Sequence, residues 1–367
     1  MTWNLPSKRR LVLPLPLVLV TCVLAAVLHS GDAAAATGLE KIQSLGGGRF
    51  MVSESRAVTA KGLTSLRLSG PNNLSGHVVM VVGGSDSVIV GISKVLRVES
   101  EEIAADLDEE IEVQLQPSEE MMRIDVRTPT GAPWEGSDWG VTLDLTISVP
   151  ANWDLSFNTR HFEYDLTGPF KDVSITTEFG RVKLSDVTRR VDIRGNYTGI
   201  ELADIKGAIT ARTAYADIDV QRAISDVERP AELINTSGSI TVKGLAGALI
   251  AETHYAPIRL ENISLVGSTS RVIGDNAPIE LGIVEFGRAR LEVESSYAPI
   301  EVRVPSHLSA RLNISVGDGG TIRTSGLEIQ THPDLLGSTR LEGICGAGGG
   351  IIDIRASGSS LVELQGQ

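Results

Sequence analysis

The feature that most limits how this chain can fold is a repeat of about eighteen residues in its C-terminal half. A couplet of two hydrophobic residues, separated by one position, recurs there with spacings of 18, 18, 18, 22, 18, 21 and 21 residues. The couplets are Tyr164/Leu166, Val182/Leu184, Ile200/Leu202, Ile218/Val220, Ile240/Val242, Ile258/Leu260, Ile279/Leu281 and Ile300/Val302. A weaker couplet lies nine residues before each, and this offset stays fixed while the period varies. Insertions are therefore expected at one corner of the repeat only.

Hydrophobic residues at every second position predict short strands with one buried face. Two or three such strands per period, separated by Gly, Asn, Asp, Ser or Pro, are typical of one coil of a β-solenoid, which buries its inward side chains by stacking on its neighbours. A sandwich of regular hairpins is the competing all-β architecture, but its strands need not repeat residue types at equivalent positions. We therefore predict an all-β fold, a β-solenoid similar to a right-handed β-helix, with coils of about 18–21 residues.

The composition agrees with a narrow, strand-rich interior. Aromatic residues make up 4% of the 367 residues and hydrophobic residues 42%, so the apolar share comes mainly from Val, Ile, Leu and Ala. The formal net charge is −13, with 33 Lys and Arg against 46 Asp and Glu, which argues against a nucleic-acid partner. The two cysteines, Cys22 and Cys345, are too few for a cysteine-based metal site.

The first 36 residues are typical of an export signal. The basic residues Lys8–Arg10 precede an apolar run over 11–28, and Ala34–Ala36 forms a small-residue cleavage site. Cleavage leaves a chain that begins near Thr37; alternatively the apolar run remains as a membrane anchor, or Leu19–Cys22 serves as a lipoprotein signal. Every alternative predicts an extracytoplasmic location, in the periplasm, at the cell surface or secreted.

The rest of the chain divides into three parts by pattern. Residues 37–49 are expected to be a linker with a short helix around Leu39–Leu45. Residues 50–150 alternate apolar and polar residues without the period, which predicts an irregular β segment that caps the solenoid, because an open end would expose unpaired strand edges. Residues 151–367 are expected to form the β-solenoid repeat domain.

Strand-like runs are visible throughout the predicted cap and again near the C-terminus. In the cap they are Leu66–Leu68, His77–Val82, Ser87–Val90, Val95–Val98, Ile111–Leu115, Met122–Val126 and Val141–Val149. After Pro305 they are Ala310–Ser315, Gly320–Thr324 and Gly350–Ile354, which we expect to close the solenoid.

The repeats resemble a bacterial family of extracytoplasmic β-strand-repeat proteins known as putative adhesins. The resemblance lies in the Gly-x-Ile-x-Leu/Val couplets of Thr198–Leu202 and Ser237–Val242, in Leu145–Pro150, and in the glycine-rich Gly348–Ile354. It covers roughly residues 60–357. It implies a β-solenoid outside the cytoplasm, with attachment or envelope-stress roles in some relatives. It carries over no catalytic residues.

One column of residues, three positions before each strong couplet, is rich in aromatic side chains. The column is His161, Phe179, Tyr197, Tyr215, Ser237, Tyr255, Asn276 and Tyr297. The first interpretation is a stacked ladder, because like residues meet at equivalent positions of successive coils. The second is a flat ligand stripe for sugar rings or peptide, with Phe179, Tyr197, Tyr215, Tyr255 and Tyr297 as its candidate residues.

Other candidate sites have weaker patterns. The acid-rich stretch from Glu99 to Glu110 lacks the spacing of a calcium loop and is interpreted as a solvated face. The histidines outside the leader, His77, His161, His254, His307 and His332, are scattered without metal-ligand spacing. Carboxylates recur on the coils at Glu201, Asp204, Asp217, Asp219, Glu252 and Glu261, near Arg194, Arg212 and Arg259. Polysaccharide-active β-helices use such carboxylates and basic residues in catalysis. Alternating charge on the outer face is also what any soluble solenoid needs.

These observations favour a non-catalytic, exported cell-envelope protein that acts as an adhesin-type binding or scaffolding module. We expect no metal and no cofactor. The expected partner is a cell-wall glycan or an envelope protein, with membrane contact only through an uncleaved N-terminal segment. Two alternatives remain: a polysaccharide lyase or hydrolase on the same fold, and a structural envelope-stress component.

Overall fold

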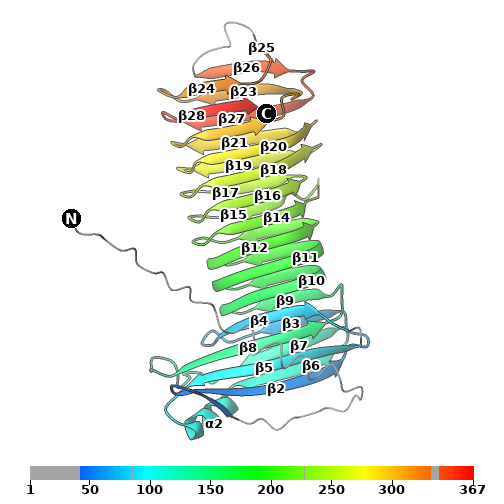
Figure 1. The fold of residues 1–367 in the computed structure, drawn as a ribbon, viewed down its shortest axis with the longest axis vertical. Helices are drawn as coiled ribbons and strands as arrows, with labels where there is room; N and C mark the ends of the chain where they lie inside the picture. The colour runs from blue at the N-terminus through cyan, green and yellow to red at the C-terminus, as the bar shows by residue number, and fades with distance from the viewer. Residues whose placement is uncertain (1–41, 85, 227, 332–338) are drawn as a thin grey trace, which may run out of the picture. The chain divides into compact units, whose positions relative to one another are not determined.

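Successive repeats pair with one another as parallel strands, and this pairing generates the fold (Figure 1). The computed structural model describes residues 42–84, 86–226, 228–331 and 339–367, all within one compact unit, Gly38–Gln367. In the described residues the chain is all-β, as predicted, with 28 strands in one mixed sheet and one helix. The pairing joins residues eighteen apart, so that Ile200 lies opposite both Val182 and Ile218.

The strands form two ladders. In order of pairing, ladder 1 contains β2 (Arg49–Thr59), β5 (Ser87–Arg97), β8 (Gly140–Val149), β4 (Ser75–Val82), the first halves of β10 (His161–Thr176) and β11 (Phe179–Arg194), β12 (Tyr197–Lys206), β14 (Ile218–Ile224), β16 (Ile240–Ala246), β18 (Ile258–Val266), β20 (Ile279–Gly287), β22 (Ile300–Val304), β28 (Leu361–Gly366) and β24 (Thr321–Ser325).

Ladder 2 contains, in the same manner, β6 (Glu112–Ser118), β7 (Met121–Arg127), β3 (Ser65–Ser69), β9 (Asp154–Asn158), the second halves of β10 and β11, β13 (Ala208–Arg212), β15 (Ala231–Ile234), β17 (Leu249–Thr253), β19 (Thr269–Asp275), β21 (Arg290–Ser296), β27 (Gly350–Ser357), β23 (Ala310–Val316) and β26 (Arg340–Cys345). Two short strands, β1 (Gln43–Gly46) and β25 (Ile329–Gln330), pair with β2 and β26.

The core lies between the two ladders and includes the strong couplets predicted from the sequence. Ile200, Ile218 and Ile240 stack on one another in register and are all fully buried. Because each side chain meets a similar one from the next repeat, β-branched residues fill the same narrow space along the whole stack. The repeated residue types at equivalent positions are thus the direct cause of the in-register pairing.

At two of its bends, the chain has residues with positive φ angles at equivalent positions of several repeats. Asp186, Asp204 and Asn262 occupy equivalent bends with positive φ angles of 58°, 56° and 57°, a conformation that Asp and Asn tolerate better than most residues. Gly207 follows at φ 101°, where an added Cβ would lie 2.1 Å from the Arg189 carbonyl oxygen. These bends set off a short third buried segment, which includes Ile205 near the end of β12.

The N-terminal part is more regular than the sequence predicts. Strand β3 pairs in parallel between β7 and β9, and β4 pairs in parallel between β8 and β10, so that both ladders extend into residues 50–150. The antiparallel pairs described at this end are β1–β2, β2–β5, β5–β8 and β6–β7. The predicted runs Ser87–Val90 and Val95–Val98 belong largely to one strand, β5, because Gly91 continues the alternation instead of breaking it.

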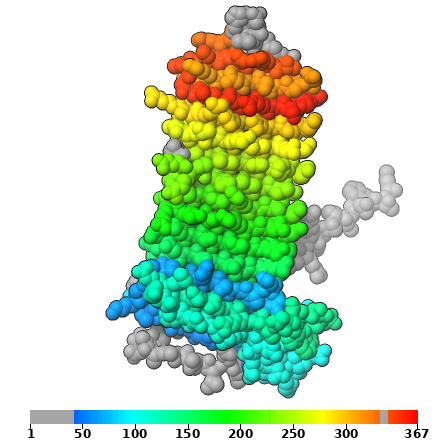
Figure 2. Space-filling view, turned by 180° about the vertical axis from the view of Figure 1, so that it is seen from behind, coloured from blue at the N-terminus to red at the C-terminus, as the bar shows by residue number. Residues whose placement is uncertain are grey.

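The C-terminal strands are inserted into the stack instead of closing it. Strand β27 pairs with β21 on one side and β23 on the other, and β28 lies between β22 and β24. In Figure 2 the red band of these last strands accordingly lies between the yellow and orange bands. The prediction that Gly350–Ile354 helps to close the stack is therefore wrong, because alternation specifies a strand's face but not its neighbours.

Two predictions concern the N-terminus. The helix expected around Leu39–Leu45 is wrong for its described part, since Gln43–Gly46 is strand β1, joined to β2 through Gly46–Gly48. The predicted export signal over residues 1–36 lies outside the described residues. Within the described residues, no helix is long and apolar enough to cross a membrane.

The stacked core can be tested on one strand of ladder 1. Leu184 is fully buried, whereas its neighbour Lys183 is exposed on the outer face. We expect Leu184→Ala to lower the free energy of unfolding by about 3 kcal/mol, because it leaves a cavity in the column. Lys183→Ala should change it by less than about 0.5 kcal/mol. Chemical denaturation of both variants measures this, and equal losses would contradict the assigned faces.

Candidate functional site

The aromatic column sits at the tight corner that leads from ladder 2 back to ladder 1. This corner is held by buried polar side chains two positions before the column. They are Thr177, Thr213, Asn235 and Thr253, each less than 7% exposed. Thr177 Oγ1 donates to the carbonyl oxygens of Arg160 and Phe179, both at 3.2 Å. The bond to Arg160 joins one repeat to the next and the bond to Phe179 is local, so together they fix where the column side chain leaves the backbone.

Four members of the column stack face to face. The ring centroids of His161 and Phe179 are 4.8 Å apart with an interplanar angle of 10°. Phe179 and Tyr197 follow at 5.2 Å and 3°, and Tyr197 and Tyr215 at 4.7 Å and 15°. These separations match the strand spacing of about 4.8 Å, so the ring stack continues the backbone ladder outward.

The stack ends after Tyr215, where Ser237 takes the next position of the column. Tyr255 and Tyr297 lie further along and are exposed to 67% and 75%, compared with 47% for Tyr197. In the described chain, the ring contact recorded for Tyr255 is a tilted one with His254 at 6.3 Å. Of the five candidate stripe residues, the structure therefore brings together Phe179, Tyr197 and Tyr215 and leaves Tyr255 and Tyr297 outside the stack.

The chemistry of the column follows from this geometry. Inside the stack each ring covers the faces of its neighbours, so Tyr197 offers solvent mainly its edge and hydroxyl group. Where Ser237 interrupts the column, aromatic faces without a recorded ring contact lie on the far side of Tyr215 and beside Tyr255. Aromatic faces and edges with polar groups nearby are what rings of sugars and peptides contact at protein surfaces.

The carboxylates and arginines on the outer faces pair across neighbouring strands. Arg222 donates to both carboxylate oxygens of Asp204 at 2.6 Å, and this bond lowers the pKa of Asp204. Other pairs follow the same rule; they are Arg181 with Glu201, Arg212 with Glu232, Lys243 with Glu261 and Arg259 with Glu280. Of the predicted carboxylates, Glu201, Asp204 and Glu261 thus lie in exposed pairs with cations of neighbouring strands.

One small group of carboxylates is different. Burial raises the pKa of Asp219, and the neighbouring carboxylates Asp217 and Glu201 raise it further. Asp217 accepts hydrogen bonds from the backbone N–H and hydroxyl of Ser239 at 2.8 and 2.7 Å. A carboxyl with a raised pKa is a feature of acid catalysts, although mutual repulsion along a strand gives the same effect.

The acid-rich stretch forms a helix that the sequence analysis missed. Helix α2 (Glu101–Glu110) begins at Ser100, whose Oγ accepts a bond from the Ile103 N–H at 3.3 Å. Serine followed by two glutamates, with apolar residues at Ile103 and Leu107, is a helix-start signal that the high charge concealed. Most of its carboxylates lie on the exposed side. Among the described residues, no group of three or more His, Cys, Asp or Glu side chains is placed to hold a metal.

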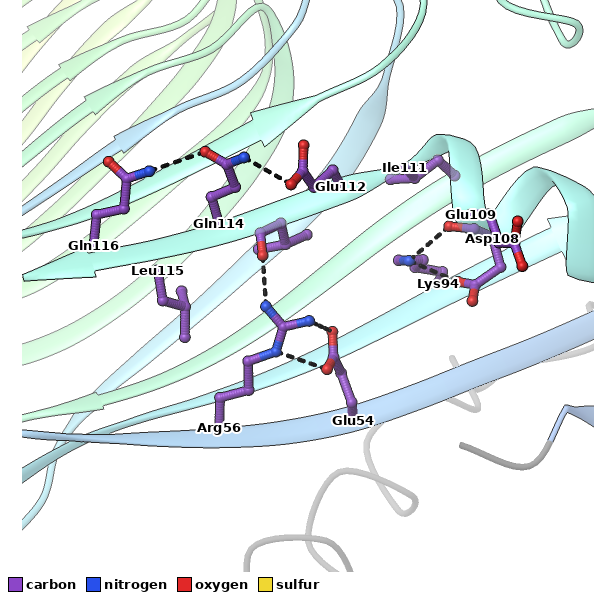
Figure 3. A pocket seen from close by; sticks show the side chains of 11 residues that line it. Glu54, Arg56, Lys94, Asp108, Glu109, Ile111, Glu112, Gln114, Leu115 and Gln116 are labelled. Carbon is purple, nitrogen blue, oxygen red and sulfur yellow. Dashed lines mark hydrogen bonds and ion pairs between the residues drawn. The ribbon is translucent and has the colours of Figure 1, made fainter. Parts of the chain in front are cut away.

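A polar hollow of about 460 Å³ lies between this helix, β6 and strands β2 and β5 (Figure 3). Its two cations are already bonded. Lys94 donates to Asp108 Oδ1 at 2.6 Å, and Arg56 donates to Glu54 and to the Val113 carbonyl oxygen. These bonds attach helix α2 to β5, and β6 to β2, so the hollow is part of the local structure and not a charged ligand site.

The predicted histidines do not gather. His161 is the first ring of the stack, and His254 lies 3.7 Å from Asp275 and 4.0 Å from Glu252 in exposed contacts. His77 lies beside Asp144 on strands β4 and β8, where burial raises the pKa of Asp144 and His77 opposes the shift. His332 lies outside the described residues.

The ring stack predicts a measurable contribution to stability. Tyr197→Ala removes two ring contacts at once, and each such pair is worth about 0.5–1.5 kcal/mol. We therefore expect the free energy of unfolding to fall by about 1–3 kcal/mol. Tyr255→Ala, a tyrosine of the same column outside the stack, is the matched control and should change it by less than about 0.5 kcal/mol. Equal losses in thermal or chemical unfolding would show that the stack adds nothing.

No family model matches this sequence, and no curated protein matches it. Solved structures do show similarity. A structure described as a putative cell adhesion protein from Clostridium sporogenes covers 89% of this chain and 100% of its own, with 9% identity and a TM-score of 0.24. A putative adhesin from Parabacteroides distasonis covers 85% and 96%, with 10% identity and a TM-score of 0.33. Another from Bacteroides fragilis covers 85% and 96%, with 8% identity and a TM-score of 0.27. These TM-scores are too low for the likeness to assign a fold or function to this chain.

Proposed function

We propose that this chain is a non-catalytic β-solenoid that acts at the cell envelope, outside the cytoplasm, as an adhesin-type binding module. The observation that carries the proposal is the aromatic column, in which exposed Tyr197 and Tyr215 stand on a corner fixed by buried hydrogen bonds. A rigid row of rings offers many shallow contacts without any moving part. Its partner is an envelope glycan.

The distribution of charge supports binding over catalysis. A glycoside hydrolase needs two carboxyl groups facing one another across a bond, and a lyase needs a base beside the sugar. Here the outward carboxylates pair with cations of neighbouring strands, as Asp204 does with Arg222 and Glu261 with Lys243. Net charge −13 likewise favours an uncharged partner over an acidic polymer.

The proposed location rests on the sequence of the first 36 residues. Their basic start, apolar run over 11–28 and small-residue exit form an export signal, which is either cleaved or kept as the membrane anchor. In both cases the repeat-bearing part of the chain, including residues 151–367, faces the envelope space where glycans are found.

A polysaccharide-active enzyme is the second candidate, because the pKa of Asp219 is raised beside Asp217 and Glu201. The two functions predict different products. A binding module retains its glycan unchanged, whereas a hydrolase or lyase releases new chain ends.

One assay separates them. The full chain is incubated with purified bacterial cell-wall glycan, and both co-sedimentation and reducing-sugar release are measured. We expect the chain to sediment with the glycan and to release no reducing sugar above the blank. The double variant Tyr197→Ala/Tyr215→Ala should sediment at least fivefold less. Ile224→Ala, which removes an exposed apolar side chain at another corner, should sediment normally.

Two results would contradict the proposal. If the double variant sediments as much as the unaltered chain does, the column does not take part in binding. Release of reducing sugar that disappears in Asp219→Asn would assign catalysis to the carboxylate group instead.

A further inference from the structure

We propose that the interruption of the aromatic column at Ser237 is a slot for one pyranose ring of an uncharged glycan, held between Tyr215 and Tyr255. This inference rests on the proposed binding function and names its site. The space between these two tyrosines at Ser237 is called the Ser237 slot below.

Ser237 occupies the position of a missing ring between Tyr215 and Tyr255. Its backbone N–H donates to the Ala214 carbonyl oxygen at 2.8 Å. In the stacked part, the Tyr197 N–H donates to the Glu178 carbonyl oxygen at the same distance. The backbone therefore continues unchanged, and only the ring is absent.

The next coil keeps the same register at this corner. The His254 N–H donates to the Thr236 carbonyl oxygen at 3.2 Å, as the Ala214 N–H donates to that of Asn196 at 3.0 Å. Tyr255 therefore follows Ser237 in the column just as Tyr215 precedes it.

The width of the slot suits one inserted ring. Tyr215 and Tyr255 are two strand spacings apart, about 9.6 Å. A ring midway would lie about 4.8 Å from each, which agrees with the 4.7 and 5.2 Å between ring centroids in the stack. Across the described residues, no ring contact joins Tyr215 to Tyr255. Their exposures of 56% and 67% agree with open faces on both sides.

The polar groups at the slot favour a sugar over an aromatic side chain of a partner protein. Thr236 and Ser237 carry hydroxyl groups at the interruption of the column, and Asp217 lies two residues after Tyr215. The backbone N–H and the hydroxyl group of Ser239 both donate hydrogen bonds to Asp217 Oδ1, and neither of these two bonds goes to Oδ2. Sugar hydroxyls match such donors and acceptors, and a phenyl or indole ring would leave them unused. The carboxylate also repels acidic sugars, which selects an uncharged ring.

The orientation of the slot constrains how a glycan enters. The stacked rings are nearly parallel to one another. A ring inserted among them therefore lies parallel to them, with its plane perpendicular to the direction in which the strands stack. A polysaccharide can then place either a terminal residue or a single crossing residue in the slot. A polysaccharide with a residue in the slot therefore crosses the column at that point.

The second interruption of the column, at Asn276, is not equivalent. Asn276 and Tyr297 have positive φ angles of 53° and 60°, so their side chains leave the corner in another direction. The Tyr297 ring also lies against Gly358, where an added Cβ would be 2.6 Å from its Cδ1. The inference therefore applies to the Ser237 slot alone.

The decisive variant fills the slot with the protein's own ring. Ser237→Tyr is expected to extend the stack from Tyr215, to keep or raise the melting temperature, and to weaken sugar binding at least tenfold. Binding is measured by ligand-observed NMR titration of the full chain with the uncharged trisaccharides cellotriose and tri-N-acetylchitotriose. Tyr255→Ala removes one wall and should also weaken binding, whereas Tyr297→Ala, a tyrosine of the column away from the slot, should not.

Three results would overturn the inference. They are the absence of trisaccharide binding to the unaltered chain, equal binding by a folded Ser237→Tyr variant, and binding of a tryptophan-containing peptide at the slot in place of the sugars. The sedimentation assay distinguishes an error in the slot proposal from an error in the proposed binding function. If Ser237→Tyr still sediments with cell-wall glycan as the unaltered chain does, the binding function stands and the slot does not.

Discussion

The structure depends on parallel, in-register pairing of segments about eighteen residues apart. Because the register is kept at the couplets in repeat after repeat, similar side chains meet from one repeat to the next: Ile200 packs on Ile218 inside, and Tyr197 stacks on Tyr215 outside. Interactions that are small in a single pair are therefore repeated along the whole stack. The same register explains the ion pairs on the outer faces, since it brings Arg222 beside Asp204.

The corner between the ladders connects this register to function. Buried hydrogen bonds from Thr177, Thr213 and Asn235 hold the turns at a constant geometry, so the column side chains leave the backbone at the strand spacing. Where the sequence supplies rings, they stack; where it supplies Ser237, the spacing persists without a ring. The proposed binding slot thus follows from a substitution in a ladder whose backbone hydrogen bonds continue.

Much of the fold could be predicted from the sequence, because period-two alternation determines which face is buried and the eighteen-residue period determines which residues meet. The order of strands at the two ends could not, since β3 and β4 and the C-terminal β27 and β28 insert between strands distant in sequence, and alternation carries no information about neighbours. Helix α2 was concealed by its charge. The aromatic column could be found in the sequence. The buried threonines and asparagine behind it could not, because they resemble ordinary turn residues. The separation of Tyr255 from the stack follows from Ser237 alone.

The central claim is the register, and disulfide formation between engineered cysteines tests it most directly. With Cys22 and Cys345 replaced by Ala, Lys183→Cys is combined either with Glu201→Cys, its partner in the next strand, or with Asp219→Cys, one strand further. Adjacent strands place the Cα atoms about 4.8 Å apart, within disulfide range, whereas two spacings of about 9.6 Å exceed it. The account predicts rapid oxidation of the first pair and none of the second. Oxidation of the second pair, or of neither, would contradict it.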